Sequence, residues 1–288
     1  MEKPNRTVLI SGCSDGGIGA ELAKELHNAG LKVYATARKT ASMAELEALG
    51  IETLQLDIQS EESIQDCVRL IPRLDILINN AGMQYTMPVS DISLKDAKAV
   101  FDTNVWGHIA LTQHCLPLLQ ESVSPMIVNH TSVGSTMSMP FMSVYNASKA
   151  ALSMFSDCMR LELAPFGIKV INLKTGAVKT NIITKLAAKE AEVPGNSIYF
   201  PAKEALSGTL RGDGMKDGGM PADQWAKQVA KDLLKANPSS NVWRGQGATM
   251  VWILGLFPYG TFDFMLKKIS GLSDVVKELS KQGKLGSK

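Results

Sequence analysis

Tyr145 and Lys149 stand four residues apart in "SVYNASKAALS", at the start of a segment whose apolar residues recur at helical spacing. Side chains at positions i and i+4 of a helix share one face, so the phenol and the ammonium become neighbours. A neighbouring ammonium favours the phenolate and lowers a tyrosine pKa that is ordinarily about 10. The pair predicts a tyrosine that gives or takes a proton near neutral pH, as carbonyl reduction requires.

The Tyr-x-x-x-Lys spacing is common by chance, and two further polar residues give it weight. Ser132 ends the apolar segment "MIVNHTS". Parallel sheets bind ligands at the carboxyl edge, where its hydroxyl would hydrogen-bond a substrate oxygen beside Tyr145. Asn104, in "FDTNVWG", lies in a helical pattern, where asparagine has modest propensity. It is interpreted either as a buried residue that bonds a helix carbonyl or as a relay that holds water near Lys149.

The stretch "SGCSDGGIGAEL" (11–22) carries Gly12, Gly16, Gly17 and Gly19 between an apolar run and a helical pattern. Glycines at the first turn of a βαβ unit permit a tight turn, a close approach of backbone to a pyrophosphate, and close helix packing. The helix start then offers free N–H groups and the positive end of its dipole to phosphates. The stretch is predicted to be a dinucleotide phosphate cradle rather than only a flexible loop.

The residues after the second apolar segment decide which dinucleotide this loop would hold. Chains that bind NAD usually carry an acidic residue about 20 positions beyond the glycines, which bonds the ribose 2′-hydroxyl. In "YATARKT", Ala37 fills that position, and Arg38 and Lys39 follow. A guanidinium makes paired, charge-assisted hydrogen bonds to phosphate, so Arg38 favours NADP(H) over the alternative of a solvated loop charge. Asp57, ending the third apolar segment, would accept from the adenine amino group.

Short β-rich segments alternate with helical patterns through the first 175 residues. Several are continuous apolar runs, which suits strands of a parallel sheet buried on both faces. Repeated βα units imply right-handed crossovers and a doubly wound parallel sheet, the Rossmann-like α/β fold class. The expected strands are 7–12, 32–37, 52–58, 74–80, 125–132 and 168–176, and the expected helices are 17–29, 41–49, 60–71, 93–119 and 143–166.

The character of the chain changes after Thr180, but no feature marks a domain boundary. Residues 208–221 are rich in glycine and charge and predict a mobile loop, whereas 221–236 predict a helix. Residues 1–288 are therefore expected to form a single domain, in which 181–270 build the substrate pocket and its lid. The late aromatic residues would either line that pocket or pack in the core or a dimer contact: Trp243, Trp252, Phe257, Tyr259 and Phe262.

The bulk composition bounds the class of protein. The chain has 288 residues, 45% hydrophobic and 20% charged, with a formal net charge of +2. These values are ordinary for a soluble globular protein, and no basic stripe interleaved with aromatics predicts nucleic-acid binding. Four scattered cysteines indicate a reducing, intracellular compartment. The histidines lack ligand spacing, so no metal is expected, and hydride transfer needs none.

The expected location is the cytoplasm, because no signal peptide opens the chain. The longest nearly uncharged stretch, 247–262, is too short for a confident transmembrane helix and contains Pro258. The segment 247–270 is instead a candidate for peripheral contact with a membrane, such as the endoplasmic reticulum or a lipid droplet. Lys267 and Lys268 would then lie near anionic headgroups.

In order and spacing, "SGCSDGGIG", "LDILINNAG", "FDTNVWG", "VNHTS", "YNASK" and "KTGAVKT" resemble the motifs of the short-chain dehydrogenases/reductases, across about the first 180 residues. The resemblance implies a catalytic tetrad of Asn104, Ser132, Tyr145 and Lys149. Lys149 would also bind the nicotinamide ribose, and Thr180 would hold the carboxamide end. Similar enzymes are commonly homo-oligomers. The implied cofactor contacts are Gly12, Ser14, Asp15, Gly17, Ile18, Arg38, Asp57, Asn80, Tyr145, Lys149, Val178 and Thr180.

Two positions depart from the family pattern. Four residues instead of three separate Gly12 from the Gly17-Ile18-Gly19 trio, so the glycine loop is one residue longer than usual. Thr175 stands where the family often has proline, which affects the local loop shape. The long loop, "VYATAR", "SVYNASKAAL" and "NVWRGQGATMVWILGLFP" together resemble one fungal branch, the NADPH-dependent 1-acyldihydroxyacetone phosphate reductases and their relatives.

The sequence therefore predicts an NADPH-dependent reductase of a hydrophobic ketone, which would be lipid-like, steroid-like or a secondary metabolite. Hydride would pass from the nicotinamide to the carbonyl carbon while Tyr145 protonates the oxygen. The alternative is a sensor on the same fold that binds NADP(H) without chemistry. The complete tetrad counts against that alternative, because a sensor has no need of a tuned phenol.

Overall fold

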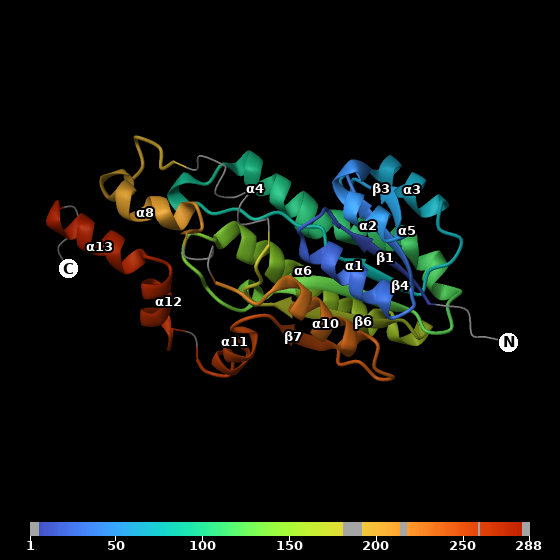
Figure 1. The fold of residues 1–288 in the computed structure, drawn as a ribbon. Coiled ribbons are helices and arrows are strands. Elements are labelled where there is room, and N and C mark those ends of the chain that lie inside the picture. The colour runs from blue at the N-terminus through green and yellow to red at the C-terminus, as the bar shows by residue number, and fades with distance from the viewer. Residues whose placement is uncertain (1–5, 181–191, 214–217, 259, 284–288) are drawn as a thin grey trace.

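The computed structural model describes residues 6–180, 192–213, 218–258 and 260–283, and Figure 1 shows their fold. Within these residues, seven parallel strands form one sheet in the order β3-β2-β1-β4-β5-β6-β7. The order reverses between β1 and β4, and such a reversal opens a ligand-binding crevice at the carboxyl ends of the strands. The predicted doubly wound sheet is confirmed. The strands are β1 (Thr7–Ser11), β2 (Lys32–Ala37), β3 (Glu52–Gln55), β4 (Ile76–Asn79), β5 (Met126–Ser132), β6 (Lys169–Thr175) and β7 (Asn241–Arg244).

Helices follow most of the strands. The α-helices are α1 (Ile18–Asn28), α2 (Ala44–Ala48), α3 (Glu61–Arg69), α4 (Leu94–Phe101), α5 (Gly107–Gln120), α6 (Ser143–Glu162), α8 (Lys203–Leu210), α10 (Ala222–Leu233), α11 (Ala248–Leu254), α12 (Asp263–Ile269) and α13 (Leu272–Lys281). Short helical turns are η1 (Thr40–Met43), η2 (Val89–Asp91), η3 (Asp102–Trp106), η4 (Val133–Ser135), η5 (Ala164–Phe166) and η6 (Phe200–Ala202). No described helix is long and apolar enough to cross a bilayer.

The core lies on both faces of the sheet, as strand β1 illustrates. Val8 and Ile10 belong to the cluster that contains residues of α1 and α10, whereas Leu9 belongs to the cluster with α3 and α5. Alternate residues of a strand point to opposite faces, so a strand covered on both sides must be apolar throughout. The continuous apolar runs in the sequence therefore reflect helices packed on both faces.

The structure corrects several predicted elements. The expected helix 93–119 is divided into α4 and α5 by a π-helical turn, η3, and such turns are frequent at functional sites. The third strand ends at Gln55 rather than at residue 58, because Asp57 closes a turn through its carbonyl and the Ser60 N–H. Helix α8 continues to Leu210, into the stretch expected to be a loop.

The elements after residue 240 were not predicted. Strand β7 has only four residues, at the start of the motif "NVWRGQGATMVWILGLFP", so it lacks the length that marks a strand in sequence. It nevertheless pairs in parallel with β6 and extends the sheet. Helices α11 and α12, in the aromatic segment, have seven residues each, too few to show a clear helical period. Helix α13, in the lysine-rich tail, does show one that sequence reasoning missed, because Leu272, Val275, Val276 and Leu279 recur at helical spacing.

A third hydrophobic cluster lies apart from the two clusters of the sheet. Leu206 and Leu210 of α8 pack with Val275 of α13 and with Phe141, which follows η4. Figure 1 shows α8, α12 and α13 at one end of the molecule, beyond the sheet. This satellite cluster gives the C-terminal helices a small core of their own.

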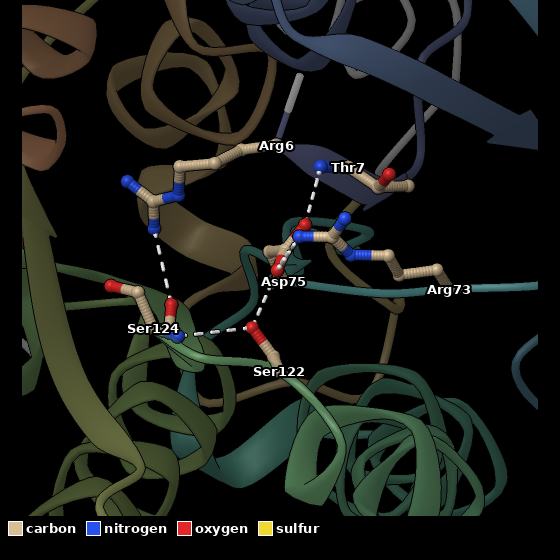
Figure 2. A network of polar contacts seen from close by, with 6 residues as sticks. All are labelled: Arg6, Thr7, Arg73, Asp75, Ser122 and Ser124. Carbon is tan, nitrogen blue, oxygen red and sulfur yellow. Dashed lines mark hydrogen bonds and ion pairs between the residues drawn. The ribbon is translucent and has the colours of Figure 1, made fainter. Parts of the chain in front are cut away.

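A buried carboxylate joins three strands at the amino edge of the sheet (Figure 2). Asp75, at 1% exposure, accepts the Thr7 N–H at 2.8 Å, the Ser122 hydroxyl at 2.5 Å, and the Arg73 guanidinium at 3.1 Å. Its own backbone bonds Thr7 and Met126, so the starts of β1, β4 and β5 meet at this residue. Burial alone would raise the pKa of Asp75, but these hydrogen bonds and the Arg73 charge lower it overall.

Candidate active site

The glycine loop has the geometry of a phosphate cradle. Gly12 and Gly16 have φ of +77° and +71°, in the left-handed region that favours glycine. A Cβ atom on Gly12 would lie 2.7 Å from the Ala81 Cα, and one on Gly19 would strike the Asn80 side chain and the Gly12 carbonyl. Helix α1 begins at Ile18 without a side-chain cap, so its first N–H groups face the loop. Close backbone packing and an uncapped helix start fit a bound pyrophosphate.

The inserted residue in this loop is anchored to the segment after β2. Cys13 N–H donates to the Thr36 carbonyl at 2.8 Å, and Asp15 N–H donates to the Ser42 carbonyl at 2.8 Å. The Ser14 and Ser42 hydroxyls lie 3.1 Å apart. The Asp15 carboxylate accepts the Glu45 N–H at the start of α2, at 3.4 Å. The longer loop is therefore held against the segment after β2, and the Asp15 carboxylate accepts a hydrogen bond from within the protein.

Arg38 lies at the exposed position immediately after β2, on the same edge of the sheet as the glycine loop. No carboxylate in the described part of the chain forms an ion pair with it. Asp57 follows β3 and is half-buried, and its carboxylate accepts the Gln59 N–H at 3.0 Å. Both residues therefore lie where the sequence places the adenosine half of the cofactor, with Arg38 available to an anionic group.

Asn80 supports the glycine loop from the end of β4. Its side-chain amide donates to the carbonyls of Ser11 and Gly12 at 2.8 and 2.9 Å, and its backbone N–H donates to the Ser11 hydroxyl. The Asn80 Oδ1 atom lies 2.8 Å from Nδ1 of His130. Asn80 therefore fixes the carbonyls of the loop, while Ile18 packs on the core beside it.

Ser132, Tyr145 and Lys149 come together at the carboxyl edge of the sheet. Ser132 ends β5, and its Oγ accepts the Gly134 N–H at 3.0 Å and shares a hydrogen bond with Tyr145. Tyr145 and Lys149 lie on the first turns of α6. The Lys149 Nζ atom is buried and donates to the His130 carbonyl at 2.9 Å. The predicted neighbourhood of the three side chains is therefore present.

The predicted effect of Lys149 on Tyr145 is wrong for the protein alone. Burial raises the pKa of Tyr145 above its ordinary value of 10, and the hydrogen bond with Ser132 lowers it only in part. Burial also lowers the pKa of Lys149 to about 8. The ammonium is directed to the His130 carbonyl, and burial is the largest influence on the pKa of the phenol. The proton therefore stays on Tyr145 at neutral pH.

Asn104 is buried but does not bond a helix carbonyl, the first of the two interpretations given for it from sequence, and its role as a relay that holds water stays a prediction. Its amide bonds both the N–H and the carbonyl of Met83, at 2.8 and 2.9 Å, and also donates to the Ser148 hydroxyl at 3.0 Å. It therefore bonds the loop after β4 rather than a helix carbonyl. A Cβ atom on Gly82 would lie 3.5 Å from the Asn104 Oδ1 and 3.6 Å from the Lys149 Nζ. The glycine thus keeps open the space that both polar groups face, and the π-turn η3 presents Asn104 to it.

The loop after β6 is held on two sides. Ala177 pairs with Gln246 after β7, and Val178, which is buried, pairs with Met220 before α10. A Cβ atom on Gly176 would strike the Gln246 carbonyl, so the two loops are in close contact. Thr180 ends this described segment, half-buried. The unpredicted strand β7 therefore helps to shape the loop that carries Val178 and Thr180.

A cavity of about 500 Å³ lies between the η4–α6 segment and the satellite helices, and Asn146, the residue after Tyr145, belongs to its lining. Apolar side chains dominate its lining: Val89, Met137, Met139, Phe141, Tyr199 and Leu272. None of the described late aromatics lines this cavity, and their place in a substrate pocket or lid stays a prediction. Trp252 and Phe257 are half exposed, and Trp243 packs against the Lys174 ammonium. Tyr259 lies outside the described residues, as do 181–191 of the segment expected to form the pocket.

Sequence reasoning missed His130, which lies at the centre of this arrangement. Its Nδ1 contacts Asn80, its Nε2 lies 2.7 Å from the Thr175 hydroxyl, and its carbonyl accepts from Lys149. The sequence offered one signal, because Thr175 stands where proline is usual. No group of three or more potential metal ligands occurs among the described side chains.

Comparisons with known proteins agree with this geometry. The family model for short chain dehydrogenases matches residues 6–191. A short-chain dehydrogenase/reductase of Pestalotiopsis microspora is 47% identical over 279 residues, which cover 96% of this chain and 98% of that protein. An NADPH-dependent 1-acyldihydroxyacetone phosphate reductase of Schizosaccharomyces pombe is 40% identical over 209 residues, 69% of each chain. The crystal structure of a short-chain dehydrogenase of Streptomyces avermitilis aligns with a TM-score of 0.76 at 27% identity, covering 96% of this chain and 98% of that one.

Proposed function

The chain belongs to the short-chain dehydrogenases/reductases, and from this membership we propose that it reduces the ketone of a hydrophobic substrate with NADPH. As a member of this family the protein is an oxidoreductase that binds a nicotinamide dinucleotide. The observation that carries the proposal is the meeting of Ser132, Tyr145 and Lys149 beside the glycine cradle at one edge of the sheet. Gly134 and Asn146, which lie close in sequence to Ser132 and Tyr145, line an apolar cavity.

When bound, NADPH would supply the hydride that the carbonyl carbon accepts. Tyr145 donates its phenolic proton to the carbonyl oxygen, so one O–H bond breaks at the tyrosine and another forms on the product alcohol. The raised pKa of Tyr145 suits this role, because a phenol that keeps its proton at neutral pH is ready to act as the acid. Ser132 holds the same oxygen by a hydrogen bond, and solvent returns the proton to Tyr145.

Arg38 supports NADP(H) as the preferred dinucleotide. Its guanidinium is exposed after β2, and Ala37 replaces the carboxylate that would bond a ribose hydroxyl and repel a phosphate. The S. pombe relative is described as NADPH-dependent, which agrees with this preference. Asn80 holds the Gly12 carbonyl of the loop that would receive the pyrophosphate, and Lys149, at the same edge of the sheet, would bond the nicotinamide ribose.

The cavity supports an apolar substrate. Methionine and aromatic side chains line it, and flexible thioethers adapt to irregular hydrocarbon shapes. The S. pombe relative acts, by its name, on an acylated dihydroxyacetone phosphate, and a cavity of about 500 Å³ suits part of an acyl chain or a fused ring system. We therefore place lipid-like, steroid-like and secondary-metabolite ketones in the substrate class.

The test is NADPH oxidation against a panel of ketones from these three classes, with NADH in parallel and with Tyr145→Phe as the matched variant. We expect turnover with NADPH that is lost in Tyr145→Phe, while the variant retains its affinity for NADPH. Tight NADPH binding without turnover on any ketone would instead support the sensor, and preferential turnover with NADH would overturn the choice of dinucleotide.

We also propose that the face formed by α11, α12 and the turn between them touches a lipid surface. Leu256 and Phe264 are each 72% exposed, which is unusual for large apolar side chains in one short segment. Trp252 adds an exposed indole, and Lys267 and Lys268 place two cations on the same segment for anionic headgroups. A lipid-like substrate would reside in the same surface.

Flotation with vesicles tests this contact. The full chain should float with vesicles that contain phosphatidylserine, and Phe264→Asp should abolish the flotation. Leu161→Asp is the matched control, because Leu161 is 65% exposed on α6, away from this segment. A chain that does not float, or a Phe264→Asp variant that floats as well as the parent, would overturn the proposal.

The exposed face of α6 supports a homo-oligomer. Met154, Cys158 and Leu161 recur at helical spacing and are exposed, and Trp106 lies against Phe155 beside them. We propose that two copies bury this face against each other. Analytical ultracentrifugation should give a multiple of the chain mass that falls to the single-chain mass in Leu161→Asp but not in Phe264→Asp. A parent chain that sediments as a monomer would contradict the proposal.

A further inference from the structure

We propose that His130 is a positioning residue that joins the loop holding the cofactor phosphates to the loop holding the nicotinamide. The inference rests on the proposed function, since it assigns a role in binding NADP(H). His130 lies on β5, two residues before Ser132, and is buried at 6% exposure. Both ring nitrogens have partners, Asn80 Oδ1 at 2.8 Å and Thr175 Oγ1 at 2.7 Å. These partners stand at the carboxyl ends of β4 and β6.

The neighbours of the imidazole determine which nitrogen carries its proton. The amide group of Asn80 donates to the two carbonyls of Ser11 and Gly12, so the opposite atom of its carboxamide, Oδ1, faces His130. An amide oxygen only accepts, and therefore Nδ1 of His130 must donate. Rotating the Asn80 carboxamide would place its oxygen against two carbonyl oxygens, which excludes the reversed arrangement.

The proton on Nδ1 fixes the direction of the whole chain of hydrogen bonds. A neutral imidazole with Nδ1–H has a lone pair on Nε2, so Nε2 accepts from the Thr175 hydroxyl. The chain then runs from Thr175 to His130, from His130 to Asn80, and from Asn80 to the glycine loop. Each member is satisfied by the next, and a chain of this kind holds a single arrangement.

The surroundings of His130 keep its imidazole neutral and restrict the orientation of the ring. Burial lowers the pKa of His130 far below 6.5, and the charge of Lys149 lowers it further. The Trp225 ring of α10 stacks on it with centroids 5.3 Å apart and planes 21° from parallel. A proton carrier would need a pKa nearer to neutral, so the ring acts as a rigid spacer.

The same residue also places the catalytic lysine. The carbonyl of His130 accepts the Lys149 ammonium at 2.9 Å. A displacement of the ring along β5 would therefore move the glycine loop, the β6 loop and Lys149 together. This hydrogen bond also accounts for threonine at position 175, where the family often has proline, because proline has no hydroxyl to donate to Nε2 of His130.

Thr175 gives the sharpest test, because its hydroxyl can be removed without loss of volume. Thr175→Val leaves Nε2 of His130 buried without a hydrogen-bond donor. If the lost hydrogen bond positions the cofactor loops, its free energy corresponds to about a tenfold change in the Kd for NADPH. We expect the Kd for NADPH, measured by fluorescence titration, to rise about tenfold in Thr175→Val and to stay within about twofold in Thr175→Ser. The KM for the ketone should not change in either variant.

Two controls separate this role from simple destabilisation. Thr209→Val removes a hydroxyl that bonds the Ser270 carbonyl in the satellite helices, and it should leave the Kd for NADPH unchanged. In the parent protein, imidazole nitrogen NMR should show His130 as the neutral Nδ1–H form at pH 6. The Nε2–H form, or a Kd for NADPH that Thr175→Val does not raise, would overturn the inference.

The outcome also distinguishes this inference from the proposed reaction. If Thr175→Val weakens NADPH binding as expected but no ketone is turned over, the positioning role stands and the reaction is wrong. If the parent chain does not bind NADPH at all, both proposals are overturned.

Discussion

Tyr145 combines a raised pKa with the proposed role of proton donor, and the pKa is directly measurable. Burial favours the neutral phenol, so the side chain should remain protonated through the neutral range in the free protein. A spectrophotometric titration of the parent minus that of Tyr145→Phe should show one tyrosine that ionises above pH 10. An ionisation near pH 7 in the difference titration would mean that Lys149 dominates burial.

Arg38 makes the preference between dinucleotides depend on one exposed side chain. A charged hydrogen bond to phosphate contributes about 1.5–3 kcal/mol, so Arg38→Ala should weaken NADPH binding by about tenfold or more. The affinity for NADH should stay the same, because NADH lacks the 2′-phosphate. Arg69→Ala is the control, since Arg69 is an exposed arginine on α3. Equal losses for both dinucleotides would place Arg38 elsewhere in the site.

At the scale of the element, Asp75 ties three strands together at the edge opposite to the site. Asp75→Ala leaves the Thr7 N–H buried without an acceptor, and we expect it to lower the free energy of unfolding by about 2–3 kcal/mol. Urea denaturation at pH 7 measures this loss, and NADPH affinity should not change. Asp66→Ala, which removes an exposed ion pair with Arg69, should cost less than about 1 kcal/mol.

The lowered pKa of Asp75 also gives this element a pH dependence. A carboxyl whose folded pKa is depressed stabilises the fold above its unfolded pKa of about 3.8, and this contribution is lost as the pH falls through the folded value. The parent should therefore lose part of its stability below about pH 4, and Asp75→Ala should lack that part. Parallel pH profiles for the two proteins would contradict this assignment.

Patterns in the sequence predicted the elements whose signal is local. Strand β1 and the glycine loop follow from an apolar run and glycine spacing, and the neighbourhood of Tyr145 and Lys149 follows from helical periodicity. Strand β7 did not, because four residues gain their pairing only from β6, which lies far away in sequence. The satellite cluster was not predicted for the same reason, because Phe141 is distant in sequence from α8 and α13 and contacts them only in the folded chain.

The site was predicted less completely than the fold. The pattern identified Ser132, Tyr145 and Lys149, but the balance between burial and charge at Tyr145 depends on neighbours that spacing does not reveal. His130 was invisible for a related reason. Its partners, Asn80 and Thr175, are each about fifty residues away in the chain, and only the parallel register of β4, β5 and β6 makes them neighbours.

At the scale of the whole molecule, the satellite cluster predicts that binding of the two ligands can be separated. Leu206 is fully buried among α8 and α13, and Leu206→Asp should undock these helices without opening the sheet. We expect the KM for the ketone to rise several-fold and the Kd for NADPH to stay constant. Hydrogen exchange should show lost protection in α8 and α13, while Val123→Asp, at a 94% exposed position, should change neither. Equal loss of both affinities would show one cooperative unit.

Two buried neutral histidines set the response of the whole fold to mild acid. Burial lowers the pKa of His108 to about 3 and that of His130 far below 6.5. Below pH 6.5 the unfolded chain binds protons that the folded chain does not, so stability falls with pH by about 1.4 kcal/mol per unit for each histidine. Urea denaturation between pH 7 and pH 5 measures this slope. A flat profile would mean that these imidazoles titrate in the fold as they do in the unfolded chain.

The separate core of the satellite helices has a consequence for how such a chain diverges over generations. Phe141 belongs both to the satellite cluster and to the lining of the cavity, whereas Ile18 beside the glycine loop packs on a cluster of the sheet. Under the proposed function, changes to the satellite helices would alter which substrate fits while the dinucleotide site keeps its own support. We therefore expect substrate choice in a chain of this plan to change more readily than its reductant.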